Sequence, residues 1–132
     1  MARPRIVVVD DDLVHLTVLQ EVLEDEGYAV ATLDDLSQGY GLVKVYRPTL
    51  VILDLVQERR QLGLEVIAAL QADIDTRDLP ILITSADSQA IKEHPGQFRD
   101  VGIAALEKPY NFEDLLVLIR ERVPTDAGAA QF

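Results

Sequence analysis

The sequence predicts a doubly wound α/β domain built on a five-stranded parallel sheet. Five short runs rich in Val, Ile and Leu alternate with helical patterns, at residues 5–9, 29–33, 50–53, 80–84 and 104–107. Alternation of strands and helices is typical of a parallel sheet. The runs are apolar almost throughout, which indicates strands whose two faces are both covered by helices.

Helical periodicity follows the strand runs. The segment from Leu13 to Glu26 repeats apolar residues at helical spacing, and Gly27 follows it where a left-handed cap favours glycine. A weaker helical pattern covers 36–46, because its glycines lower the helix propensity. A third helix is predicted over 63–72, which carries apolar residues on one face.

Of the last two helical segments, the first is interrupted by a helix breaker and the second is regular. A fourth helix is expected within 87–101, but Pro95-Gly96 lies inside it, so we expect a short helix that ends near Glu93. The final helix begins after Asn111, a suitable N-cap. Its apolar positions are Phe112, Leu115, Leu116 and Ile119.

Length, charge and cysteine content limit the class of protein. The 132 residues suit one domain over 1–123, followed by a flexible tail over 124–132. A formal net charge of −11 disfavours binding to nucleic acid, whose phosphates attract Lys and Arg. The absence of cysteine excludes disulfides, thiolate metal sites and cysteine nucleophiles. No apolar run is long enough for a secretory signal or a membrane span, so we expect a cytoplasmic protein.

Four of the strand runs end in residues that can handle phosphate. Asp10-Asp11-Asp12 follow the first run, Asp54 the third, Ser85 the fourth and Lys108 the fifth. Ligands of open α/β sheets bind beyond the carboxyl ends of the strands. We therefore expect these residues to meet at one edge of the sheet.

The three adjacent aspartates indicate a cation-binding site. Neighbouring carboxylates raise each other's pKa unless a positive charge compensates them. Mg²⁺ prefers oxygen ligands and usually takes one or two protein carboxylates together with phosphate. Asp10 and Asp11 are the candidate ligands, and Asp54 supplies a further one. Asp12 has two open interpretations, as part of this site or as a helix N-cap.

Ser85 and Lys108 complete a set suited to a phosphorylated carboxylate. A phosphoryl group on Asp54 would present oxygens that need neutralising and hydrogen bonding. Mg²⁺ would take one oxygen, the Lys108 ammonium would pair with another, and the Ser85 hydroxyl would donate to a third. Pro109 fixes the chain just after the lysine and allows a cis bond there.

These residues lie in motifs that resemble the receiver domain of two-component response regulators, of the chemotaxis-regulator type, over residues 4–123. The matching segments are VVVDDD at 7–12, VILDL at 51–55, ILITSA at 81–86 and EKPY at 107–110. Each motif is weak alone, whereas all four in this order and spacing are highly specific.

The resemblance implies a flavodoxin-like (CheY-like) sheet of order 2-1-3-4-5. It implies that Asp54 accepts a phosphoryl group from a histidine of a sensor kinase or phosphotransfer protein, and that a partner protein reads the change. Asp11 would bind Mg²⁺ directly, Asp10 mainly through water, and the main-chain carbonyl of Val56 would be a further ligand. Ser85 and Lys108 would bind the phosphoryl oxygens. Beyond its own phosphorylation and dephosphorylation, such a domain is not an enzyme.

Two departures from the family pattern affect loops and signalling. Gly63 comes nine residues after Asp54, where the family usually has glycine at eight, so the intervening loop is expected to be one residue longer. Ala105 stands where the family often has an aromatic ring that swings inward on activation. Together with Pro95-Gly96, this alanine suggests that phosphorylation is transmitted through a backbone change across 86–103.

Two other functions fit parts of the same sequence. In a haloacid-dehalogenase-type phosphatase, Asp10 would attack the substrate and Asp12 would serve as the acid and base. That interpretation leaves Asp54 without a role. The sequence also lacks the further acid cluster that such enzymes carry. A phosphorylation-independent pseudo-receiver would keep the fold and act only as an interaction module.

Overall fold

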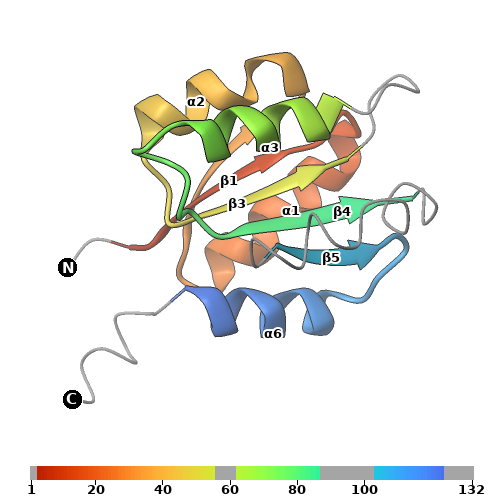
Figure 1. Cartoon of the computed structure of the whole chain (residues 1–132). Helices are drawn as coiled ribbons and strands as arrows, with labels where there is room; N and C mark the ends of the chain where they lie inside the picture. Colours follow the sequence, from red (N-terminus) through yellow and green to blue (C-terminus); the bar gives the residue numbers. More distant parts are fainter. Residues whose placement is uncertain (1–2, 56–61, 87–102, 124–132) are drawn as a thin grey trace.

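A computed structural model describes residues 3–55, 62–86 and 103–123 of the chain. These residues form one sheet of five parallel strands in the order β2-β1-β3-β4-β5. Figure 1 shows β1, β3, β4 and β5 side by side in this sheet. The strands are β1 Arg5–Val9, β2 Ala29–Leu33, β3 Leu50–Asp54, β4 Ile81–Ser85 and β5 Ala104–Glu107. The predicted fold class and strand order are confirmed, and the predicted strand bounds agree to within one residue.

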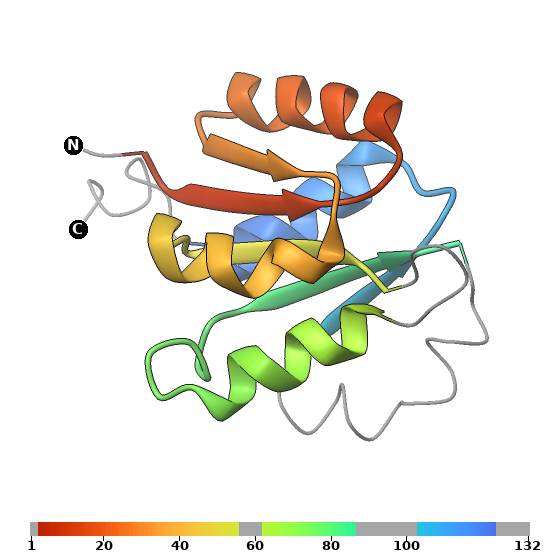
Figure 2. The same ribbon diagram turned by 90° about the horizontal axis from the view of Figure 1, so that it is seen from above.

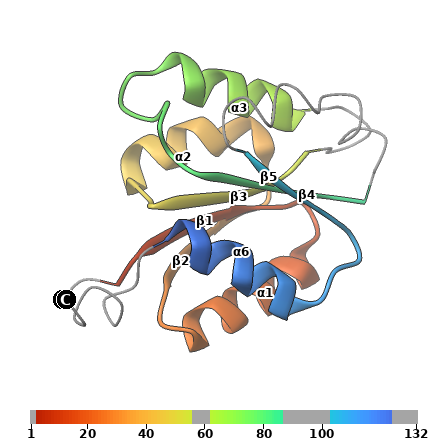
Figure 3. The ribbon, with the colours of Figure 1, turned by 60° about the horizontal axis from the view of Figure 1, so that its bottom comes forward.

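Helices cover both faces of the sheet. On one face, α2 and α3 lie side by side over the strands (Figure 2). On the other face lie α1 and α6 (Figure 3). The helical segments are α1 Leu13–Asp25, the 3₁₀ turn η1 Leu36–Gln38, α2 Gly39–Tyr46, α3 Leu62–Ala72 and α6 Phe112–Arg122.

The apolar strands divide their side chains between two cores. Along β1, Val7 and Val9 pack with α2 and α3, whereas Ile6 and Val8 pack with α1 and α6. Successive side chains of a strand point to opposite faces, so a strand covered on both sides must be apolar at every position. This requirement accounts for the unbroken apolar runs in the sequence. Among the described residues, no helix is both long and apolar enough to cross a membrane.

The helix ends follow the local signals with one refinement. Gly27 has a φ of 98°, the left-handed conformation expected after α1. Asn111 caps α6, because its side-chain oxygen accepts a hydrogen bond from the backbone N–H of Asp114. The weak pattern over 36–46 divides into η1 and α2, and the Asp35 side chain caps η1. The expected helix within 87–101, the tail 124–132 and Val56 lie outside the described residues.

The strand register aligns the ends that carry the candidate residues. Val9 pairs with Leu53 in β3, Asp54 pairs with Thr84, and Ser85 pairs with Glu107 in β5. Parallel strands in this register finish together at one edge of the sheet. The residues that follow β1 and β5 therefore lie beside the last residues of β3 and β4.

Gly63 allows α3 to begin directly against the end of β3. A Cβ atom at position 63 would lie 2.7 Å from the Cα of Leu55 and 2.8 Å from the carbonyl oxygen of Asp54. Both neighbours are backbone atoms, so neither can rotate away. We expect Gly63→Ala to lower the free energy of unfolding by about 2 kcal/mol, as for an overpacked core, measured by urea denaturation.

Gly41→Ala is the matched control for this prediction. Gly41 is exposed in α2, and a Cβ atom there would meet nothing within 4 Å. Because alanine is the better helix former by up to about 1 kcal/mol, this variant should be slightly more stable than the wild type. If Gly63→Ala were as stable as Gly41→Ala, the inference that α3 packs too closely against β3 for a Cβ atom at position 63 would be wrong.

Candidate functional site

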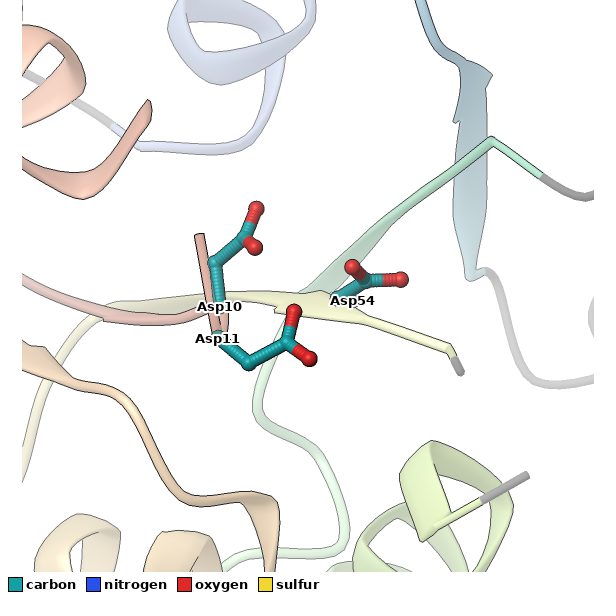
Figure 4. A group of neighbouring side chains, drawn as sticks. All are labelled: Asp10, Asp11 and Asp54. Carbon is teal, nitrogen blue, oxygen red and sulfur yellow. The ribbon is translucent and has the colours of Figure 1, made fainter. Parts of the chain in front are cut away.

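Three carboxylates meet at the carboxyl edge of the sheet (Figure 4). Asp10 and Asp11 follow β1, and Asp54 is the last residue of β3. Each offers an oxygen atom, and these atoms all lie within 4.8 Å of one another. Asp10 and Asp54 are buried, with 1% and 7% of their surface exposed, whereas Asp11 faces solvent. The sheet therefore holds a compact group of three acids that is open on the side of Asp11.

Lys108 reaches this group from the end of β5. Its Nζ atom lies 2.7 Å from Asp10 Oδ2 and 3.2 Å from Asp54 Oδ2. Burial alone would lower the pKa of Lys108, but the hydrogen bond to Asp10 and the charge of Asp54 outweigh it and raise the pKa above its usual value. Lys108 is thus a fixed cation, placed where it neutralises part of the negative charge.

The Lys108 backbone is tied to the fourth strand. Its N–H donates a hydrogen bond of 2.8 Å to the carbonyl oxygen of Ser85, and the Lys108–Pro109 peptide bond is cis. Ser85 is buried as the last residue of β4, with 1% of its surface exposed. The structure therefore brings the ends of all four motifs to one edge, as the sequence predicted for Asp10, Asp11, Asp54, Ser85 and Lys108.

Both carboxylate oxygens of Asp10 have hydrogen-bond partners. Its Oδ1 accepts a hydrogen bond from the Asp12 N–H at 3.0 Å, and its Oδ2 lies 2.7 Å from both Lys108 Nζ and His15 Nδ1. Burial raises the pKa of Asp10, but hydrogen bonds from His15, Lys108 and the Asp12 backbone outweigh burial and lower the pKa to about 2. Asp10 is therefore a fixed anion at neutral pH.

Asp12, the third aspartate, caps α1. Its Oδ1 accepts hydrogen bonds from the backbone N–H groups of Val14 and His15. This contact satisfies donors that the first turn of a helix leaves without intrahelical partners. Of the two interpretations that the sequence left open, the structure shows the capping role.

Sequence reasoning missed two residues of this site, His15 and Tyr110. His15 lies in the first turn of α1 and contacts Asp10, while its Nε2 lies 2.7 Å from the hydroxyl of Tyr110. Tyr110 follows Pro109 in the last motif. The spacing of five residues between Asp10 and His15 was only a weak signal of their contact. It predicts that the two side chains lie close together only once the start of the helix is known.

The donor set fits a small divalent cation. The oxygens around an octahedral Mg²⁺ lie at most roughly 4.2 Å apart, and Mg²⁺ keeps several of its waters. A spread of up to 4.8 Å over three carboxylates suits direct contact with one or two of them and contact through water with the rest. Carboxylate oxygens without nitrogen or sulfur ligands are also the chemistry that Mg²⁺ favours.

Two hollows in the described surface differ in their relation to these carboxylates. One of about 320 Å³ opens beside Lys108 and is bordered by His15 and Tyr110. A slightly larger one, about 350 Å³, lies beside Lys44 and Pro48, before the start of β3 and thus at the opposite end of the sheet. The first borders Lys108, which contacts two of the acids, although Asp10, Asp11 and Asp54 do not themselves line it.

Comparisons with known proteins identify the family of this chain. A sequence model of the response regulator receiver domain family matches residues 6–120. The response regulator MprA of Mycolicibacterium vanbaalenii is 35% identical over 131 residues, which cover 96% of this chain and 54% of that protein. RpaA of Synechocystis sp., described as a DNA-binding dual master transcriptional regulator, is 31% identical over 130 residues, which cover 94% of this chain and 53% of that protein. The chain thus spans about half the length of these relatives.

The fold has close counterparts among solved structures. The chemotaxis response regulator CheY4 of Vibrio cholerae superposes with a TM-score of 0.79, covering 92% of this chain and all of that one. The two sequences are only 24% identical, so this likeness concerns the fold. The family assignment depends on the sequence match over 6–120, which contains every motif that supplies the acids and the lysine. The chain belongs to the response regulator receiver domain family.

Proposed function

We propose that this chain accepts a phosphoryl group on Asp54 in a magnesium-dependent reaction and signals the modification to a partner protein. The observation that carries the proposal is the meeting of three carboxylates and one lysine around Asp54. A cation site alone would explain the acids. A lysine that contacts both Asp10 and Asp54 adds the positive charge that a phosphorylated aspartate needs.

The proposal gives each residue a distinct role. Asp11 is exposed and would ligate Mg²⁺ directly. Asp10 would contact Mg²⁺ through water, because both of its oxygens already have protein partners. Ser85 and Lys108 would bind phosphoryl oxygens. The family resemblance adds the carbonyl of Val56 as a metal ligand, which lies outside the described residues.

The reaction is a phosphoryl transfer between two protein side chains. An oxygen of the ionised Asp54 carboxylate attacks the phosphorus atom in line with the P–N bond of a phosphohistidine. The P–N bond breaks, the imidazole keeps the electron pair, and an acyl phosphate remains on Asp54. Bound Mg²⁺ would neutralise charge on the phosphoryl oxygens. Lys108 then shares its positive charge between Asp10 and the new phosphoryl group.

The proposed partners are proteins. The donor is a sensor histidine kinase or a histidine phosphotransfer protein in the cytoplasm, and the target is a protein that binds the phosphorylated form. A net charge of −11 makes nucleic acid an unsuitable partner for this domain. The change around Asp54 would pass to such a target through the backbone of 86–103, as the sequence suggests, and residues 87–102 of that segment lie outside the described part of the chain.

Acetyl phosphate provides the test of this function, because it is a small donor that needs no partner protein. We expect the chain to gain one phosphoryl group in the presence of Mg²⁺ and none after chelation by EDTA, as measured by intact-protein mass spectrometry. The adduct should be removed by hydroxylamine, which cleaves acyl phosphates. A chain that stays unlabelled at saturating Mg²⁺ would instead be a phosphorylation-independent pseudo-receiver.

A further inference from the structure

We propose that His15 is a positioning residue for the Asp10 carboxylate and that the Tyr110 hydroxyl holds His15 in this role. The proposal rests on the function proposed above, because it concerns the orientation of a carboxylate assigned to the Mg²⁺ site. It comes from a hydrogen-bonded chain of three side chains. The Nδ1 atom of His15 lies 2.7 Å from Asp10 Oδ2, and its Nε2 atom lies 2.7 Å from the Tyr110 hydroxyl.

The chemistry of the three groups fixes the direction of these hydrogen bonds. An ionised carboxylate can only accept, so the proton between His15 and Asp10 must belong to Nδ1. In the neutral ring Nε2 is then the acceptor, and the Tyr110 hydroxyl donates to it. A histidine bound through one nitrogen is commonly oriented by the partner of the other nitrogen. The Asp10 carboxylate therefore selects the ring form with the proton on Nδ1, and the Tyr110 hydroxyl, which donates to Nε2 in that form, holds the ring in place.

Ring packing supports the same orientation. The rings of His15 and Tyr110 meet edge to face, with centroids 5.7 Å apart. Tyr110 in turn packs edge to face against Phe112, the first residue of α6, at 6.1 Å. Edge-to-face contacts are favourable for aromatic pairs. The loop between β5 and α6 thus supports the His15 ring from the side opposite to Asp10.

The contact between His15 and Asp10 matters because Lys108 would bind both Asp10 and a phosphoryl group on Asp54. In the described structure, Lys108 and His15 both contact Oδ2 of Asp10, and the Asp12 N–H contacts Oδ1. When Lys108 turns to a phosphoryl group on Asp54, its contact with Asp10 weakens. His15 and the Asp12 N–H then keep two donors on the carboxylate. Asp10 would retain its orientation toward the metal site throughout the reaction.

Two amide substitutions that differ by one methylene group test the role of Nδ1. The side-chain amide nitrogen of asparagine lies near the position of Nδ1 in histidine, whereas that of glutamine lies near Nε2. We expect His15→Asn to bind Mg²⁺ about as tightly as the wild type and His15→Gln to bind about tenfold more weakly, as is typical when a group that orients a ligand is lost. Isothermal titration of the full chain with MgCl₂, without any phosphodonor, measures both affinities.

Tyr110→Phe tests the second half of the chain. It removes only the hydroxyl that contacts His15, so we expect a loss of Mg²⁺ affinity of about threefold, smaller than that of His15→Gln. Tyr40→Phe is the matched control, because it also removes a tyrosine hydroxyl that has a hydrogen-bond partner, in this case Asp73 on the other face of the sheet. Its Mg²⁺ affinity should equal that of the wild type.

Imidazole NMR gives a readout that does not depend on the metal. The chain has two histidines, and His15→Asn identifies the signals of His15. We expect its neutral ring to carry the proton on Nδ1 in the wild type and in Tyr110→Phe, because the Asp10 carboxylate accepts that proton. A neutral ring protonated on Nε2 would overturn the proposal. So would equal Mg²⁺ affinity in His15→Gln and the wild type, or equal weakening in the Asn and Gln variants.

The two proposals fail in different ways. If the wild type neither binds Mg²⁺ nor is labelled by acetyl phosphate, the proposed function is wrong. The NMR result then still decides whether His15 donates to Asp10. If the wild type binds Mg²⁺ and is labelled but His15→Gln matches it, only the positioning role is wrong.

Discussion

Asp54→Asn is expected to abolish phosphorylation by acetyl phosphate. The amide has the size of the carboxylate but lacks its negative charge and its nucleophilic oxygen, so no acyl phosphate can form. The variant should remain folded, because it also removes one of three mutually repelling acids. Intact-protein mass spectrometry after incubation with acetyl phosphate and Mg²⁺ measures the result.

Asp12→Asn is the matched control for this experiment. Asn caps helices about as well as Asp, and the role of Asp12 in the structure is to cap α1. Its phosphorylation should therefore equal that of the wild type. The control also tests the phosphatase interpretation, in which Asp10 attacks and Asp12 serves as the acid and base. Loss of labelling in Asp12→Asn or Asp10→Asn, with labelling retained in Asp54→Asn, would favour the phosphatase.

Lys108→Met is expected to change three properties in different directions. The free energy of unfolding without metal should fall by about 3 kcal/mol, because Asp10 stays buried and loses a cation at 2.7 Å. Mg²⁺ should bind more tightly, on the order of tenfold, because the variant lacks a positive charge beside the ligands. The rate of labelling by acetyl phosphate should fall by about 10²-fold, because the phosphoryl oxygens lose a charged donor.

Lys44→Met provides a closely matched control. Lys44 also contacts two aspartates, Asp73 at 2.7 Å and Asp75 at 3.1 Å, but at the opposite end of the sheet and with more exposure to solvent. An exposed ion pair contributes only about 0 to 1 kcal/mol. We expect Lys44→Met to leave Mg²⁺ affinity and labelling unchanged. If Lys108→Met bound Mg²⁺ no more tightly than Lys44→Met, the contact between Lys108 and the acids would not compete with the metal.

The sequence predicted most of the fold because its patterns follow local rules. A strand covered on both faces is apolar at every position, and an amphipathic helix repeats at 3.6 residues. The segment 36–46 was harder, because its glycines weaken the pattern. In the structure Gly39 is buried, and a Cβ atom there would lie 3.4 Å from Val66 in α3. That packing depends on a helix remote in sequence, so no local pattern reveals it.

The sequence alone determined which residues gather at the candidate site. Parallel strands finish at one edge, so any residue that directly follows such a strand must lie there, and this placed Asp10, Asp11, Asp54, Ser85 and Lys108. The partners of each side chain were decided only by the tertiary structure. His15 and Tyr110 are 95 residues apart, and their contact depends on the orientation of α1 relative to the loop before α6. Hydrogen bonds form within a few tenths of an ångström, a precision that residue spacing does not encode.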